Sequence, residues 1–246
     1  MLRTLVIFFS IMLVGCGAIL PHKGQEVSVD SNVMGVLKLA TVKLGTDTLT
    51  IIPDTVNLTE EGTLDWAQWG YGAEEWTDTS QYNHKAGIAP IINLDTIVVA
   101  DQIPDGKAAR AFLYTEPTGS EFTWTDGTPT DSVQNLDAGI WIPGMGNGFR
   151  ITVPAGVEKR ILKLYVGAWK ATGKLTASLS DSSSLDVSGS FKTTSMAYST
   201  LNVREFAIEY SAARNNETLA VTWIVGEYYD EDGWGNVTLR AATLSE

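Results

Sequence analysis

The sequence predicts an all-β protein, folded as an antiparallel two-sheet sandwich or jelly roll. Short apolar runs recur along the chain from about Val33 onward, and Gly, Asp, Asn, Pro and Ser separate them. Few stretches keep a helical period for ten residues or more. About ten short strands in one chain of this length favour a single sandwich over several domains.

The strand pattern is clearest in the second half of the chain, where apolar and polar residues alternate. Such alternation buries one face of a sheet and exposes the other. In the first of these runs, Phe149, Ile151 and Val153 alternate with polar residues, and the segment 154–156, Pro-Ala-Gly, is expected to end the strand. The other alternating runs are 160–169, 206–211, 219–225 and 237–242, and the earlier strand candidates are 91–100, 109–114, 122–125 and 139–142. Residues 179–194, rich in Ser and Gly, predict a long surface loop or a hairpin.

The N-terminus has the pattern of a secretory signal peptide. Arg3 is followed by the apolar run 5–14, which is shorter than the about 20 residues that a transmembrane helix needs. Residues 13–16, Leu-Val-Gly-Cys, resemble the lipobox of bacterial lipoproteins, with Cys16 the only cysteine in the chain. The resemblance implies cleavage after residue 15 and lipidation of Cys16, since two acyl chains anchor a protein stably to a membrane.

The predicted organisation is therefore a signal peptide at 1–15, a lipid-anchored tether at 16–30 and one β-sandwich domain at 31–246. The tether is short of large apolar residues, so it gives reach above the membrane. Gly17 after the cysteine resembles the outer-membrane sorting pattern. This places the protein on the bacterial outer membrane, facing the periplasm or the cell surface.

The charge of the chain argues against nucleic acid as a partner. The formal net charge is −12, and loss of Arg3 with the signal peptide makes it more negative. A phosphate-binding surface needs clustered Lys and Arg, but Lys159, Arg160 and Lys163 lie in an alternating strand-like run. The acidity suits a solvated extracellular surface.

From about Val56 to the C-terminus the chain resembles a bacterial extracellular domain, found alone or appended to surface and polysaccharide-acting proteins. Members of that family look like galactose-binding-like β-sandwiches, a fold widely used for glycan binding. The resemblance implies no ligand and no catalytic residues for this chain. The segments that carry it are 65–70, 83–87, 123–127, 146–149, 162–169, 177–181 and 235–239.

Aromatic and acidic residues gather between residues 65 and 76, and this segment is the best glycan-site candidate. Sugars stack their C–H patches on aromatic faces, while carboxylates and amides bind the hydroxyls. Trp76 and Tyr71 are the favoured contacts because they lie outside the family motif. The full candidate set is Trp69, Tyr71, Glu74, Glu75 and Trp76. The alternative is that the tryptophans close the end of the sandwich.

An acidic loop at 230–236 has a composition suited to calcium. Asp230, Asp232 and Asn236 supply oxygen ligands, which hard cations prefer. The spacing is not that of an EF-hand, because Ala241 stands where a bidentate Glu is needed. An acidic hairpin turn explains the same residues, and Asp126 with Asp131 forms a second, weaker acidic turn. Calcium is the one cofactor that the sequence suggests.

Catalytic motifs are absent from the sequence. It has no Gly-x-Ser-x-Gly, His-Glu-x-x-His, phosphate-loop or dinucleotide motif, and only two histidines, His22 and His84. His84 with Lys85 could serve as an acid or base, and a two-carboxylate glycosidase stays open. We expect a non-catalytic, surface-exposed binding module for glycan or another extracellular ligand. The alternative is a structural or adhesion protein of the cell envelope.

Overall fold

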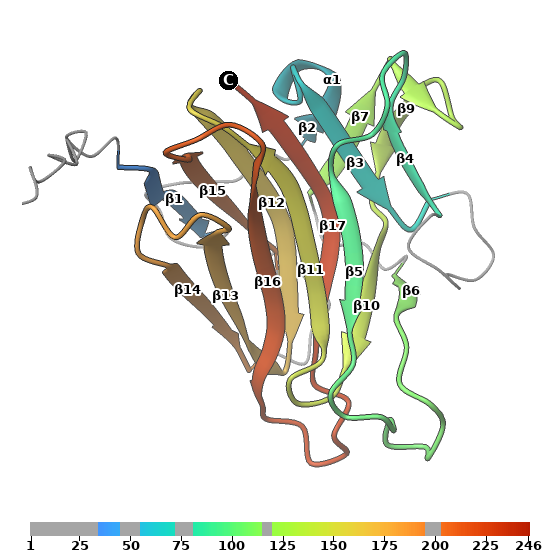
Figure 1. Ribbon diagram of the computed structural model, residues 1–246. Coiled ribbons are helices and arrows are strands. Elements are labelled where there is room, and N and C mark those ends of the chain that lie inside the picture. Colours follow the sequence, from blue (N-terminus) through green and yellow to red (C-terminus); the bar gives the residue numbers. More distant parts are fainter. Residues whose placement is uncertain (1–33, 45–54, 72–80, 115–119, 195–202) are drawn as a thin grey trace, which may run out of the picture. The chain divides into compact units, whose positions relative to one another are not determined.

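The computed structural model describes residues 34–44, 55–71, 81–114, 120–194 and 203–246, and its regular structure is almost entirely β-strand (Figure 1). Residues 33–246 form one compact unit. The described part contains no helix that is long and apolar enough to cross a membrane. The elements are β1 Val36–Leu44, β2 Thr55–Asn57, α1 Leu58–Glu61, β3 Asp65–Trp69, β4 Tyr82–Lys85, β5 Asn93–Ile97, β6 Phe112–Tyr114, β7 Glu121–Trp124, β8 Gly127–Thr128, β9 Val133–Leu136, β10 Gly139–Pro143, β11 Gly148–Ala155, β12 Arg160–Trp169, β13 Ala171–Leu179, β14 Val187–Thr193, β15 Val203–Ser211, β16 Glu217–Tyr228 and β17 Asn236–Ser245.

Two antiparallel sheets form the sandwich, which confirms the predicted fold class. The nine-stranded sheet has the order β1-β15-β12-β17-β3-β4-β8, with β10 on β17 and β6 on β10. The five-stranded sheet has the order β14-β13-β16-β11-β5. A small third sheet, β2-β7-β9, adds one parallel pair, β2 with β7.

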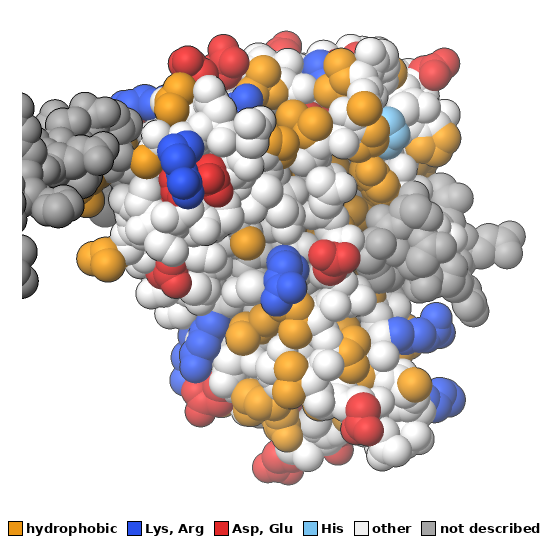
Figure 2. Space-filling model, in the orientation of Figure 1, with side chains coloured by type: hydrophobic (Ala, Val, Ile, Leu, Met, Phe, Trp, Pro, Cys, Tyr) orange, Lys and Arg blue, Asp and Glu red, His pale blue; other side chains and the backbone are white. Residues whose placement is uncertain are grey.

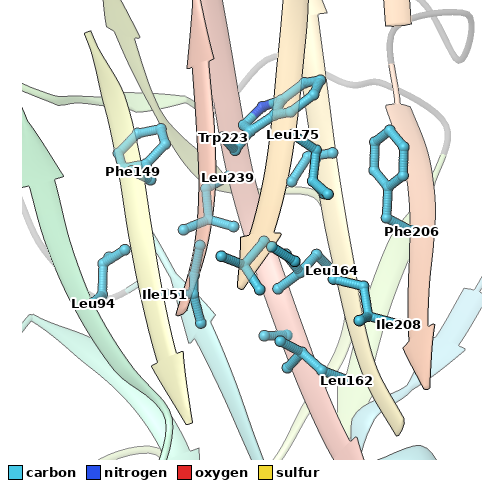
Figure 3. Packing of buried hydrophobic residues seen from close by; sticks show 14 of the residues in the cluster. Leu94, Phe149, Ile151, Leu162, Leu164, Leu175, Phe206, Ile208, Trp223 and Leu239 are labelled. Atoms are coloured by element: carbon cyan, nitrogen blue, oxygen red, sulfur yellow. The ribbon is translucent and has the colours of Figure 1, made fainter. Parts of the chain in front are cut away.

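The main core lies between the two large sheets. Leu162, Leu164 and Ile208 from the nine-stranded sheet meet Phe149, Ile151 and Trp223 from the five-stranded sheet (Figure 3). The Trp223 indole N–H donates to Gly167 O and Thr238 O, both at 3.2 Å, and so links the two sheets. Gly173 leaves room for this indole, because a Cβ there would lie 2.0 Å from the ring.

The alternating runs bury the residues that the pattern predicts. Phe149, Ile151 and Val153 are all buried on β11. The end predicted at residues 154–156 is confirmed, because β11 ends at Ala155, with Pro154 still inside the strand and paired with Thr218. Within 179–194 the hairpin alternative is correct, since β14 pairs with β13.

A second, smaller core lies on the outer face of the nine-stranded sheet, under the three-stranded sheet and α1. Trp66 of β3, Trp124 of β7 and Tyr165 of β12 are fully buried there. Alternation along β3 explains why both cores use it: Trp66 enters the smaller core, whereas Ala67 and Trp69 enter the main core. The two faces of β3 therefore carry different aromatic groups.

Candidate functional site

The predicted glycan segment is only partly described by the structure. Glu74, Glu75 and Trp76 lie outside the described residues, as does Cys16. Trp69 is 0% exposed and packs in the main core, so in this structure its ring has no face open to a ligand. Tyr71, by contrast, is 38% exposed. Of the predicted contacts that are described, Tyr71 alone is available at the surface.

Tyr71 contacts a rigid polar and aromatic group on the outer face of the nine-stranded sheet. Its ring meets Trp124 edge-on at 6.1 Å, and Trp124 packs against Trp66 at 5.2 Å. Asp126 accepts hydrogen bonds from the Thr59 hydroxyl at 2.5 Å, the Trp66 indole at 2.9 Å and Lys85 Nζ at 2.6 Å. These side chains hold β3, β4 and the turn after β7 together beneath Tyr71.

The electrostatics of Asp126 reflect these contacts. Burial acts to raise the pKa of Asp126, but the hydrogen bonds from Lys85, Thr59 and Trp66 together outweigh burial and lower the pKa. The carboxylate is therefore held in its charged form by named donors. The predicted acidic turn at Asp126 is a structural junction in this fold.

A different aromatic group lies on the inner face, and we call Trp69, Tyr82 and His84 the ring strip. Tyr82 pairs with Trp69 across β3 and β4, and their ring centroids lie 6.3 Å apart at 29°. His84, two residues along β4, lies 5.3 Å from Tyr82. Tyr82 and His84 are both half-buried. The strip thus runs from the core to the surface.

Two polar groups of the ring strip have no hydrogen-bond partner among the described residues. His84 Nδ1 lies 3.0 Å from Lys85 O. Because a carbonyl oxygen only accepts, Nδ1 is the donor of this hydrogen bond, and Nε2 takes no part in it. Within the described part of the chain, neither Nε2 nor the Tyr82 hydroxyl has a hydrogen-bond partner. Lys85 points to the opposite face, where it binds Asp126, so the predicted His84 and Lys85 acid-base pair is split between two faces.

A buried carboxylate stands behind the ring strip. Asp65 is fully buried and accepts backbone N–H groups of Trp66 at 2.8 Å, Ile91 at 2.8 Å and Ile92 at 3.2 Å. Burial raises the pKa of Asp65 despite these donors. Burial, and then the charge of Asp65, also raise the pKa of Tyr82. Asp65 fastens the segment before β5 against β3 and so fixes the surroundings of the strip.

The acidic loop predicted to bind calcium is organised by a lysine. Asp230 accepts Lys170 Nζ at 2.8 Å and the Trp234 backbone N–H at 3.0 Å, and Lys170 lowers the pKa of Asp230. Asn236 Nδ2 donates to Trp234 O at 3.1 Å, while Asp232 is exposed. Among the described residues, no group of three or more His, Cys, Asp or Glu could hold a metal ion. The Lys170 ammonium neutralises the carboxylate that the calcium hypothesis needs.

Sequence reasoning missed a third aromatic group, Phe112, Trp141 and Trp234, which we call the corner group. Phe112 and Trp141 pair across β6 and β10, and Trp234 lies in the loop before β17. One signal in the sequence points to it. Trp141 stands between Ile140 and Ile142, which are both buried in the main core, so alternation turns the indole to the outer face.

The fold defines the class of this protein as an antiparallel β-sandwich. No protein-family model and no curated protein sequence matches the chain. Among solved structures, it is similar to TmCBM61 in complex with β-1,4-galactotriose, with a TM-score of 0.37 and 9% identity over 63% of this chain and 88% of that one.

Two further solved structures show similarity of the same order. One is the enzymatically active domain of bacteriophage CBA120 tailspike protein 4, with a TM-score of 0.38 and 6% identity over 63% of this chain and 20% of that one. The other is the CBM22-1 and GH10 modules of Clostridium thermocellum endo-1,4-β-D-xylanase 10B with xylohexaose, with a TM-score of 0.29 and 12% identity over 46% of this chain and 22% of that one. Similarity at this level assigns no function.

Proposed function

We propose that this protein is a lipid-anchored, non-catalytic glycan-binding module of the bacterial cell surface, and that the ring strip contacts the ligand. The observation that carries the proposal is the pair Tyr82 and His84. Two half-buried rings lie side by side at 5.3 Å, with a hydroxyl and an imidazole nitrogen that have no partner among the described residues.

The chemistry of such a pair suits a sugar. Ring faces stack on the C–H patches of a pyranose, and Tyr82 and His84 each add a polar atom for its hydroxyls. The rings are also pre-organised, because Trp69 packs against Tyr82 from the core and Asp65 fastens the neighbouring segment. A rigid site loses less side-chain entropy when it binds.

Chain connectivity supports the same location. Residues 70–81 join Trp69 to Tyr82, which are cross-strand neighbours, so this connection begins and ends at the ring strip. The predicted contacts Tyr71, Glu74, Glu75 and Trp76 all belong to it. The sequence-based candidate and the ring strip are therefore neighbours along the chain, although Tyr71 contacts Trp124 on the outer face and the ring strip lies on the inner face.

Binding of the full-length chain in detergent to a glycan array, followed by calorimetric titration with the glycans that bind, tests the proposal. We expect Tyr82→Ala and His84→Ala to weaken binding about tenfold each, which is the loss of about 1.4 kcal/mol. Leu185→Ala is the control, since Leu185 is an 89% exposed side chain between β13 and β14, outside the strip. Thermal melting confirms that each variant is folded.

Two outcomes contradict the proposal. Silence of the wild-type chain across the array favours the structural or adhesion role instead. Binding that survives in both ring-strip variants would remove the ring strip from the site.

A further inference from the structure

The corner group forms a continuous aromatic stack on the outer face of the nine-stranded sheet. The Phe112 and Trp141 centroids lie 4.8 Å apart at 26°, and Trp234 meets Trp141 at 6.4 Å and 61°. The Arg110 guanidinium lies 4.8 Å over Phe112 at the other end of the stack. All three rings are half-buried. Because the two indole planes are steeply inclined to each other, they form two walls of a corner.

Each wall of this corner is held in place by hydrogen bonds. The Trp141 indole N–H donates to Leu113 O at 3.0 Å, which fixes the ring against β6. The backbone of Trp234 is fixed by Asp230, which Lys170 neutralises, and by Asn236. The acidic loop therefore presents Trp234 to solvent in a defined position.

Trp234 differs from the other described tryptophans in the state of its indole N–H group. The indole N–H groups of Trp66, Trp124, Trp141 and Trp223 each donate to an acceptor within the fold. Those of Trp69 and Trp169 are buried. The Trp234 N–H has no acceptor among the described residues and is not buried. Beside it, Glu231 and Asp232 are exposed carboxylates without hydrogen-bond partners in the described part of the chain.

The neighbouring loops at this end of the sandwich are also rigid. Asn147 accepts the backbone N–H groups of Val99 and Ala100 at 2.7 and 2.9 Å, and donates to Ala100 O and Pro143 O at 3.0 and 2.8 Å. These loops leave apolar side chains at the surface, with Val99 71% exposed. Figure 2 shows hydrophobic side chains gathered among charged ones over the lower ends of β11 and β16.

We propose that the corner group is a second carbohydrate-binding site, separate from the ring strip. Indole faces offer stacking surfaces for the C–H patch of a sugar ring, the Trp234 N–H donates to a hydroxyl oxygen, and Glu231 and Asp232 accept hydrogen bonds from sugar hydroxyl groups. A proline-rich peptide also docks on aromatic surfaces, but a polyproline segment has few donors for the two carboxylates. The combination of apolar faces with unpartnered acceptors therefore favours a saccharide.

The position of the corner group gives it a distinct role. β1 begins beside the end of β15, where Val36 pairs with Ser211, and the C-terminal Ser245 pairs with Ile161 at that same end. The corner group lies toward the opposite end of these strands, where Pro143 pairs with Asn236. The first described strand, β1, therefore begins at the far end of the sheet from this site. Two sites on one module raise the avidity for a polymer.

The test uses the full-length chain in detergent with ¹⁵N-labelled tryptophan, so that the indole N–H resonances can be followed by NMR and assigned by single Trp→Phe variants. Cello-, xylo-, galacto- and manno-oligosaccharides are titrated in turn, and a proline-rich peptide is titrated separately. We expect one saccharide class to shift the Trp234 indole resonance to saturation. Trp234→Ala should weaken that binding about tenfold or more, and Trp234→Phe, which keeps a ring but loses the N–H, should weaken it less.

Variants separate this proposal from the ring-strip proposal. Tyr82→Ala should leave the Trp234 shift intact, and Val99→Ala, a surface change at the same end, should leave both sites intact. An unmoved Trp234 resonance with every saccharide overturns the corner site, whether or not the ring strip binds. Saturation by the peptide alone assigns the corner to a protein partner and also overturns the proposal.

Discussion

At the scale of single residues, two aspartates hold the region around β3 and β4 together, and the fold shifts their pKa values in opposite directions. Asp65 is buried and receives backbone N–H groups, yet burial raises the pKa of its carboxyl. Asp126 is half-buried and receives three side-chain donors, which lower its pKa against the effect of burial. Each carboxylate accepts three hydrogen bonds, so the direction is decided by the deeper burial of Asp65 and by the ammonium of Lys85 beside Asp126.

Asp126 should make the fold sensitive to acid. A carboxylate whose pKa is lower in the folded state gives its full stabilisation above its unfolded value of about 3.9, and loses it as the pH falls through the folded pKa. We expect Asp126→Asn to lower the unfolding free energy at neutral pH by about 2 kcal/mol, through loss of hydrogen bonds to a charged group. The difference from wild type should shrink toward pH 3, as measured by calorimetric melting.

Asp105→Asn is the matched control for this experiment. Asp105 also pairs with a lysine, Lys107 at 2.7 Å, but the pair is exposed and an exposed pair stabilises little. Asp65 has a raised pKa, so its contribution to stability is present at low pH and is lost as the pH rises. Asp65 therefore changes the stability with pH in the opposite direction from Asp126. Because Asp65 is present in both wild type and Asp126→Asn, its contribution cancels when the two are compared. An equal difference at both pH values would contradict the assigned role of Asp126.

At the scale of elements, the loop between β16 and β17 shows how a distant strand end can organise an acidic turn. Lys170 lies between β12 and β13. Its carbonyl oxygen accepts a hydrogen bond from the Tyr229 backbone N–H at 2.7 Å, and its ammonium group donates a hydrogen bond to the Asp230 carboxylate. The Asp230 side chain is almost fully buried in that pair. The loop is therefore held at both its backbone and its carboxylate, without a metal ligand set.

We expect this loop to be indifferent to calcium and dependent on Lys170. The thermal midpoint of the wild-type chain should be the same in millimolar calcium and in chelator, because the ammonium occupies the Asp230 carboxylate. Lys170→Ala should lower the unfolding free energy by about 2 kcal/mol, since it leaves a buried carboxylate unpaired. A calcium-dependent rise that disappears when Asp230 and Asp232 are both changed to Asn would restore the calcium hypothesis.

At the scale of the whole molecule, the proposed anchor precedes, along the chain, the domain that carries the two proposed sites. The sequence predicts lipidation at Cys16, and 17 residues separate it from Met34, the first described residue. The net charge of −12 would keep the module from lying on an anionic membrane.

Lipidation has a direct test at this scale. Metabolic labelling with a fatty-acid probe should mark the wild-type chain and should not mark Cys16→Ser, because the thiol is the attachment point. Fractionation should then place the wild type in the outer membrane and the variant in the soluble fraction. A labelled, membrane-bound Cys16→Ser chain would show that the anchor is elsewhere.

The strands and their buried faces could be predicted from the sequence because alternation is a local property. Phe149, Ile151 and Val153 follow from spacing alone, whatever packs against them. Burial of the tryptophans could not be predicted in this way. Trp69 and Tyr71 lie two residues apart, yet one is in the core and the other is exposed, because Trp69 faces the second sheet and Tyr71 follows the turn at Gly70.

By itself, the sequence determined the fold class, the alternating faces and the acidic character of the chain. The tertiary structure decided which rings reach the surface and which charges are neutralised. Asp230 meets Lys170 and Asp126 meets Trp66 across 60 residues of chain each, and Tyr82 meets Trp69 by strand pairing. Such contacts depend on how strands are ordered in the sheets, and no local pattern records that order, because many topologies bury the same alternating faces.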